Sequence, residues 1–220
     1  MKLTKEEFQN YLYSYNEDEQ FYRTLYFEEK KRPETFHQFC LNLDRDLITS
    51  HLLYVPELQQ ETWYSYLEEK TMFHDIAENI MLYKHYRYTP EFVHEHEFFE
   101  ILCVYDGQAH TSIQGIDHTL HTGDICIIPP HTKHSIGIFD DSIAFNILIR
   151  GSTFQSTFFQ ALTADSALAH FFAHVLYRKT EGNYLIFHCD EDAQIREMLE
   201  TMYIEYLGHE KYSYTFLNSM

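Results

Sequence analysis

Apolar residues recur at helical spacing at the start of the chain. Phe8, Leu12 and Tyr15 stand three or four positions apart, which places them on one face of an α-helix. Thr4 precedes them and is followed three residues later by Glu7, the arrangement of a capping box at a helix start. The pattern therefore predicts that a helix opens the chain.

The pattern changes from helical to strand-like about one third of the way along the chain. Residues 17–70 carry charged and aromatic stretches broken by two prolines, and their spacing predicts two to four helices. From about residue 73, short runs of Ile, Val, Phe and Tyr alternate with turns such as Asp106-Gly107. Hairpins about ten residues apart are typical of an antiparallel sandwich or barrel.

After residue 151 the spacing of apolar residues again becomes helical in most segments. The expected elements there are two helices, one strand and a last helix, at 153–161, 165–175, 184–188 and 190–207. The last helix carries one apolar stripe, which is typical of a core or dimer contact, made of Met198, Leu199, Met202 and Tyr203. We therefore divide the chain into a helical arm at 1–70, a β-barrel at 71–151 and a C-terminal region at 152–220.

Charge narrows the choice of partners. The 220 residues include 34 Asp and Glu but 16 Lys and Arg, a formal net charge of −18. Nucleic-acid binding needs a cationic face that releases counterions from phosphates, so these residues are not expected to bind DNA. Apolar residues make up 45% of the chain, enough for a sizeable core.

Cysteine spacing and hydropathy indicate the compartment. The four cysteines show no Cys-x-x-Cys spacing, which argues against a zinc ribbon or a disulfide scaffold. The N-terminus lacks the apolar core of a signal peptide, and the sequence contains no apolar run of 18 residues. We expect a cytoplasmic protein that does not enter a membrane.

Histidines gather in the predicted barrel. His94 and His96 alternate, and alternate residues of a strand point to the same face. His134 follows Pro129-Pro130, where another strand is expected to begin. The pattern predicts that these imidazoles converge inside a small barrel.

The same residues resemble the two sequence motifs of the cupin family. The matched positions are His94, His96, Glu100 and Gly107 in the first motif and Gly123, Pro129 and His134 in the second. Three positions depart from the motifs, because Tyr88 and His131 replace expected glycines and Ile138 replaces an expected Asn. The resemblance implies a mainly β fold with flanking helices: a cupin barrel (double-stranded β-helix, or jelly roll) after an N-terminal helical arm and before C-terminal helices.

A longer stretch, roughly residues 70–207, resembles the sensor domain of AraC/XylS-type transcription regulators. The run from His94 to Gly107, the run from Leu120 to His134 and the segment 183–187 with its following acidic helix carry this resemblance. It implies an effector-sensing and dimerisation domain that binds a small ligand, such as a sugar, and forms a homodimer. DNA binding would belong to a helix-turn-helix region of about 100 residues, which this sequence does not contain. We favour a sensor portion of a longer regulator over a stand-alone cupin.

The effector is expected to contact side chains that face the barrel interior. These are His94, His96, Phe98, Glu100, Leu102 and His134. His131 is expected on the solvent side of its turn.

A divalent transition metal (Zn, Ni, Fe or Mn) is an alternative occupant. The candidate ligands are His94, His96, Glu100 and His134, the three-histidine, one-carboxylate set that cupins commonly offer. However, a straight strand would separate His96 from Glu100 by about 13 Å. Because the spacer Glu97-Phe98-Phe99 favours a continuous strand, we expect Glu100 to pair with an imidazole or an effector hydroxyl rather than to bind a metal.

Two main functions follow from these residues. The favoured one is the sensor, which is not an enzyme and for which no catalytic residue is assigned. The alternative is a metal-dependent cupin enzyme, a dioxygenase or isomerase, that uses His94, His96, Glu100 and His134. A stand-alone binding or scaffold cupin without catalysis is a weaker third possibility.

Overall fold

The computed structural model describes residues 3–58, 65–73, 79–154, 184–189 and 192–208. Its helices are α1 (Lys5–Tyr13), α2 (Glu17–Lys31), α3 (Phe36–Leu41), α4 (Arg45–Ser50), α5 (Glu69–Met72) and α8 (Ala193–Gly208), with a 3-10 turn at Pro33–Thr35. Its strands are β1 (Tyr66–Leu67), β2 (Ile80–Lys84), β3 (Glu95–His96), β4 (Phe99–Asp106), β5 (Gln108–Ile113), β6 (Ile116–His121), β7 (Ile125–Ile128), β8 (His134–Gly137), β9 (Ile143–Ile149) and β10 (Leu185–Phe187).

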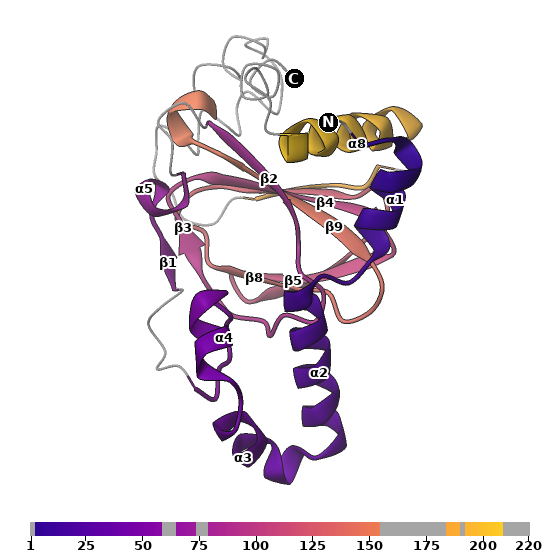
Figure 1. The fold of residues 1–220 in the computed structure, drawn as a ribbon. Helices are drawn as coiled ribbons and strands as arrows, with labels where there is room; N and C mark the ends of the chain where they lie inside the picture. The colour runs from indigo at the N-terminus through magenta and orange to yellow at the C-terminus, as the bar shows by residue number, and fades with distance from the viewer. Residues whose placement is uncertain (1–2, 59–64, 74–78, 155–183, 190–191, 209–220) are drawn as a thin grey trace.

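The strands form two antiparallel sheets that pack face to face (Figure 1). The larger sheet has the order β10-β7-β4-β9-β2, and the smaller has the order β6-β5-β8. A short parallel pair, β1 with β3, lies beside them. This arrangement confirms the expected mainly β barrel with flanking helices, including the strand predicted at 184–188 and the helix predicted at 190–207.

Alternation along β4 separates two hydrophobic layers. Leu102 and Val104 point into the barrel and pack with residues of the smaller sheet. Phe99, Cys103 and Tyr105 point outward and pack beneath helices. The side chains that cover this outer face come from α1 and α8: Phe8, Leu12, Leu199, Met202 and Tyr203.

This packing locates the predicted C-terminal stripe. Leu199, Met202 and Tyr203 are buried against the chain's own sheet, whereas Met198 remains 40% exposed. The stripe is therefore mainly core. The helices predicted at 153–161 and 165–175 lie outside the described residues, apart from positions 153 and 154.

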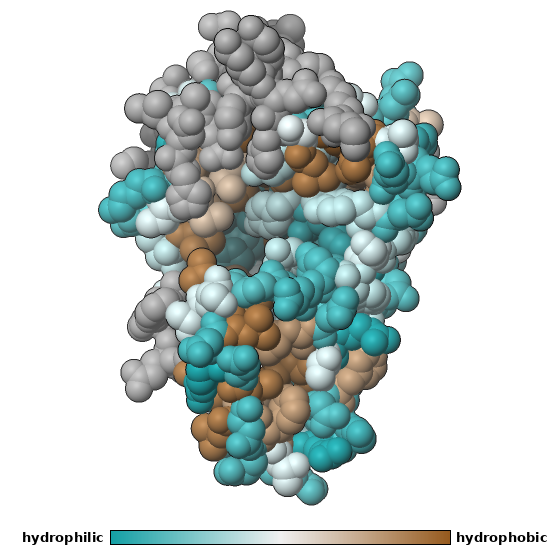
Figure 2. Space-filling model, in the orientation of Figure 1, coloured by the Kyte–Doolittle hydropathy of each residue, from teal (hydrophilic) through white to brown (hydrophobic). Residues whose placement is uncertain are grey.

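The first two helices begin with capping boxes. Thr4 and Glu7 cap α1 as predicted, and Asn16 and Glu19 form a second box at the start of α2. Whereas α1 lies on the larger sheet, α2, α3 and α4 extend beyond the smaller sheet (Figure 1). Figure 2 shows apolar side chains gathered between α2 and α4, where Tyr22 and other residues form a separate small core.

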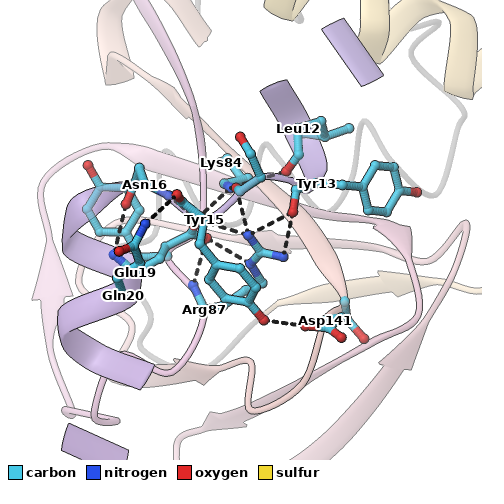
Figure 3. A network of polar contacts seen from close by, with 12 residues as sticks. Leu12, Tyr13, Tyr15, Asn16, Glu19, Gln20, Lys84, Arg87 and Asp141 are labelled. Carbon is cyan, nitrogen blue, oxygen red and sulfur yellow. Dashed lines mark hydrogen bonds and ion pairs between the residues drawn. The ribbon is translucent and has the colours of Figure 1, made fainter. Parts of the chain in front are cut away.

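A buried ionic cluster connects α2 to β2 and the turn after it (Figure 3). Glu19 is fully buried and accepts hydrogen bonds from Lys84 Nζ at 2.8 Å and Arg87 Nε at 2.9 Å. Lys84 also donates to the carbonyl oxygen of Leu12, and Arg87 donates to that of Ser14. Every strong donor of this cluster thus has an acceptor, as a buried ion pair requires.

Aromatic contacts extend the cluster. The Arg87 guanidinium lies 3.8 Å from the centre of the Tyr15 ring, a cation–π contact. The Tyr15 hydroxyl donates to Asp141 in the loop before β9. The junction of α1 and α2 therefore contacts the barrel both through Lys84 and Arg87, at and after the end of β2, and through Asp141 before β9.

Candidate functional site

A polar cluster occupies the inner face of the barrel at the ends of β3, β4 and β8. His94 and His134 form a backbone bridge, each amide donating to the other's carbonyl at 2.9 Å. The centres of their rings are 4.3 Å apart, and that of His96 lies 5.0 Å from His134. The predicted convergence of these imidazoles is observed.

Glu100 reaches this cluster, contrary to the expectation of a continuous strand. Strand β3 ends at His96, the chain bends at Glu97 and Phe98, and β4 begins at Phe99. The bend brings Glu100 Oε2 to 3.0 Å from both His96 Nε2 and His134 Nε2. The expectation of a continuous straight strand, from which the separation of about 13 Å followed, was therefore wrong, whereas the expected pairing of Glu100 with an imidazole is observed.

The bend is supported by specific contacts of both of its residues. Glu97 accepts a hydrogen bond from the backbone amide of Glu69 at 3.0 Å. Phe98 turns inward, where it stacks on His96 at 4.3 Å and meets Phe73 edge-on at 5.7 Å. Both residues gain contacts that an extended strand would not give them.

Backbone carbonyls fix the proton positions of two imidazoles. His134 Nδ1 lies 2.9 Å from the Thr132 carbonyl, and His94 Nδ1 lies 3.2 Å from the Phe92 carbonyl. Since a carbonyl oxygen only accepts, Nδ1 carries the proton in each ring, and Nε2 of a neutral ring holds a lone pair. His134 Nε2 faces the Glu100 carboxylate at 3.0 Å, so in a neutral ring a lone pair would meet an anionic oxygen. That contact becomes favourable when a proton or a metal cation lies between the two atoms.

Burial determines the charge states in the cluster. It lowers the pKa of His94 to about 3, with a further contribution from the neighbouring His134. Burial also lowers the pKa of His96, against the opposing effect of its hydrogen bond to Glu100. For Glu100, burial raises the pKa, but hydrogen bonds from His134 and His96 outweigh it and hold the pKa well below its ordinary value. Glu100 is therefore the anionic member of the cluster.

The donor set fits a divalent metal. One nitrogen each of His94 and His134 and one oxygen of Glu100 lie within 4.8 Å of one another. His96 Nε2 is 3.0 Å from the same carboxylate, and its Nδ1 is buried without a hydrogen-bond partner among the described residues. Imidazole nitrogens with one carboxylate suit zinc, nickel, iron and manganese.

Of the six predicted ligand contacts, the two apolar ones, Phe98 and Leu102, lie beside the polar cluster and deeper in the barrel, respectively. Phe98 is buried against His96 and forms one wall of the cluster. Leu102 lies two residues beyond Glu100 on the same face of β4, among apolar side chains of the barrel core.

Sequence reasoning missed three polar residues on the same inner face. Tyr83 lies near the end of β2, and His85 stands two residues later, just after the strand. Asn146 lies opposite Tyr83 on β9. Asn146 Nδ2 donates to the Tyr83 hydroxyl at 3.1 Å and lies 3.4 Å from His85 Nδ1. The alternation of Tyr83 and His85 was a usable signal, but pairing with Asn146 depends on strand register.

The backbone explains the two missing motif glycines. Tyr88 and His131 have φ angles of 63° and 60°, in the left-handed region that glycine adopts most readily. His131 is exposed, as expected, and its amide donates to the His96 carbonyl at 2.8 Å. The turn geometry is therefore retained although both glycines are replaced.

Comparison with known proteins gives the following similarities. Residues 80–185 match the family model described as the AraC-like ligand binding domain. KdgF from Halomonas sp. is 22% identical with a TM-score of 0.30, and the match covers 33% of this chain and 70% of that one. Apo ToxT from Vibrio cholerae, a single-residue variant, is 14% identical with a TM-score of 0.43, covering 64% of this chain and 51% of that one.

A Mn(II)-containing oxalate decarboxylase from Bacillus subtilis is also similar. It is 21% identical with a TM-score of 0.29, covering 35% of this chain and 22% of that one. No curated protein matches the chain significantly. Among the described residues, no helix is long and apolar enough to span a membrane.

Proposed function

We propose, because residues 80–185 match the model of the AraC-like ligand binding domain, that this chain is the effector-sensing part of a transcription regulator. The observation that carries the proposal is the polar cluster inside that domain, where Glu100 is 2% exposed and His96 fully buried. Buried polar groups are costly unless they are hydrogen-bonded, and His96 Nδ1 has no such partner among the described residues. A small molecule is the natural occupant.

The proposed ligand contacts are the residues named from the sequence. His94, His96, Glu100 and His134 supply hydrogen-bonding atoms, while Phe98 offers a ring face. Leu102 supplies apolar surface deeper in the barrel. A sugar suits this mixture, since its hydroxyls pair with polar atoms and its C–H faces pack on aromatic rings.

Dimerisation and DNA binding are further parts of the proposal. A formal net charge of −18 makes this polypeptide a poor DNA ligand, so contact with a promoter would come from a helix-turn-helix region outside this sequence. Dimerisation would use surfaces other than the buried stripe of α8. A regulator that acts on promoter DNA would do so in the cytoplasm, which is where we propose that this protein works.

Effector binding is tested by thermal unfolding of the purified chain in the presence of single sugars and other polar metabolites. A binding ligand should raise the midpoint, because it stabilises the folded state by mass action. The shift should vanish in His94→Ala and persist in His110→Ala, a change on the exposed side of β5. A shift that His94→Ala retains would place the ligand elsewhere and contradict the proposal.

A metal-dependent enzyme is the second candidate. The specific observation that favours it is the convergence of one ligand atom each from His94, Glu100 and His134 within 4.8 Å of one another. His94, His96, Glu100 and His134 would hold the ion, which supplies Lewis acidity when bound. The residues around it exclude bulk water and fix the imidazole orientations.

Elemental analysis of the untagged protein separates the two candidates. A near-stoichiometric transition metal that disappears in His94→Ala/His96→Ala supports the enzyme or a metal-dependent sensor. In that case His96→Ala should lower the unfolding midpoint of the metal-loaded protein and leave that of the chelated protein nearly unchanged. Absence of metal in the wild type, together with a sugar-induced midpoint shift, supports the metal-free sensor.

A further inference from the structure

We propose that Tyr83, His85 and Asn146 form a second contact area inside the barrel, and that this area binds a hydroxyl group of a small uncharged ligand. The inference rests on the proposed function, because it extends the effector site beyond the histidine cluster. Tyr83 lies on β2, His85 directly follows β2, and Asn146 lies on β9. All three residues are outside the cupin-like motifs.

Strand register places the second contact area beside the cluster. Asn146 is opposite Tyr83 on β2 and opposite Leu102 on β4. Glu100 lies two residues before Leu102 and is therefore on the same inner face, one row away. The two sets of polar atoms thus lie on neighbouring rows of one inner face.

Two buried polar atoms in this area lack a hydrogen-bond partner among the described residues: Asn146 Oδ1 and His85 Nε2. Asn146 Nδ2, by contrast, faces the Tyr83 hydroxyl at 3.1 Å and His85 Nδ1 at 3.4 Å. Because the amide donates toward His85 Nδ1, the proton of the neutral imidazole resides on Nε2. The area therefore presents one free acceptor and one free donor, the pair that a hydroxyl group satisfies.

A purely structural role does not account for these atoms. The neighbouring inner-face side chains Leu102, Ala144 and Leu148 are apolar, so an apolar residue at position 146 would fit its surroundings. Leaving a buried acceptor and a buried donor unpaired costs stability. Violations of this kind are typical of binding sites, where the ligand completes the hydrogen bonds.

Charge defines the ligand class. The side chains of this area are a phenol, an imidazole and an amide, and the area contributes no Lys or Arg that would bind an anionic ligand. Burial lowers the pKa of His85 to about 4, so that ring provides no positive charge near neutral pH. The area therefore suits neutral polyols and neutral sugars and disfavours sugar acids.

The test compares binding of neutral pentoses and hexoses with binding of the corresponding sugar acids by calorimetric titration. We expect at least one neutral sugar to bind the wild type, and to bind Asn146→Leu and His85→Phe at least tenfold more weakly. His110→Phe, an aromatic replacement on the exposed side of β5, should bind like the wild type. Unliganded Asn146→Leu should unfold at a temperature no lower than the wild type, which shows that it folds.

Each other outcome overturns the inference. Binding retained in both Asn146→Leu and His85→Phe but lost in His94→Ala would refute the second contact area and leave the proposed effector site intact. Tighter binding of the sugar acids would refute the ligand class. If no neutral sugar binds the wild type, this inference falls, while a midpoint shift with another metabolite that His94→Ala abolishes would still uphold the proposed function.

Discussion

Single residues in left-handed conformations maintain the turns around the histidine cluster. His131 lies at φ 60° in the turn before β8, and its amide binds the carbonyl of His96. A residue with a Cβ pays about 1 kcal/mol for such a conformation. At His131 the hydrogen bond between the backbone amide and the His96 carbonyl therefore offsets this conformational energy, which a glycine would avoid.

Replacing His131 with glycine should stabilise the protein by no more than about 0.6 kcal/mol, because the added entropy of the unfolded chain offsets most of the relieved strain. His131→Ala serves as the matched control, since it removes the same ring and keeps the Cβ. Urea denaturation gives both free energies of unfolding. A glycine variant less stable than the alanine variant by about 0.5–1 kcal/mol, the entropy cost of glycine, would show that the turn stores no strain.

His85 makes the folded state sensitive to acid. Its pKa is lowered from 6.5 to about 4 by burial, so the unfolded chain binds its proton more tightly than the folded one. Stability is therefore fully present above pH 6.5 and is lost as the pH falls toward 4. From His85 alone, unfolding free energy should decrease by about 2 kcal/mol between about pH 7 and pH 5.

The measurement is urea denaturation at a series of pH values for the wild type and His85→Phe. The variant should show a shallower decrease in this pH range, by about that amount. Parallel curves for the two proteins would mean that the pKa of His85 is the same in the folded and the unfolded chain, so that His85 does not contribute to the acid sensitivity.

At the scale of elements, α2 and β2 are joined by an ion pair that excludes water. Glu19 combines two functions, since it belongs to the capping box of α2 and also pairs with Lys84 and Arg87. Burial raises its pKa, but hydrogen bonds from Arg87 and Lys84 outweigh that effect and lower the pKa below its ordinary value. Glu19 therefore stays ionised when the helix docks.

Glu19→Gln should destabilise the protein by about 3–5 kcal/mol, because it leaves two buried cations without their counterion. Glu28→Gln, on the same helix, removes surface pairs with Lys31 and Arg32 and should change stability by less than about 1 kcal/mol. Chemical denaturation of both variants provides the comparison. A small effect of Glu19→Gln would show that Lys84 and Arg87 are solvated in the unliganded protein.

Elements with strong local signals were predictable from the sequence, and those set by tertiary contacts were not. The capping box at Thr4, the turns of the barrel and the strand around residue 186 follow from residue type and period alone. The end of β3 at His96 does not, because Glu97 and Phe98 have no turn propensity. Their bend depends on contacts with Glu69 and Phe73.

The candidate site divides in the same way. The convergence of His94, His96 and His134 follows from strand alternation. The participation of Glu100 depends on the bend, and the contributions of Tyr83, His85 and Asn146 depend on the register of β2 against β9. Neither is encoded in a local pattern.

Across the whole molecule, helices lie on the outer face of the larger sheet and a helical extension lies beyond the smaller one (Figure 1). The extension of α2, α3 and α4 has its own small core, and the Glu19 cluster ties it to β2. We therefore expect the extension and the barrel to unfold together in the wild type. Loss of the Glu19 charge should allow the extension to open first.

Hydrogen exchange measured by mass spectrometry tests this coupling. In Glu19→Gln, peptides from α2, α3 and α4 should exchange faster, while those from β4 and β9 should keep their wild-type rates under mildly stabilising conditions. In Glu28→Gln, all of these rates should stay unchanged. Uniform acceleration in Glu19→Gln would instead indicate one cooperative unit without a separable extension.

The bend at Glu97 and Phe98 fixes the length of chain between an imidazole and the carboxylate that it binds. A residue added to or removed from this two-residue gap would rotate Glu100 to the outer face of β4, because successive residues of a strand alternate sides. Related chains that preserve the cluster should consequently keep a hydrogen-bond acceptor and an aromatic ring at these two positions, and should keep the number of residues between His96 and Glu100. Gap placement in an alignment thus becomes a criterion for deciding which relatives share this site.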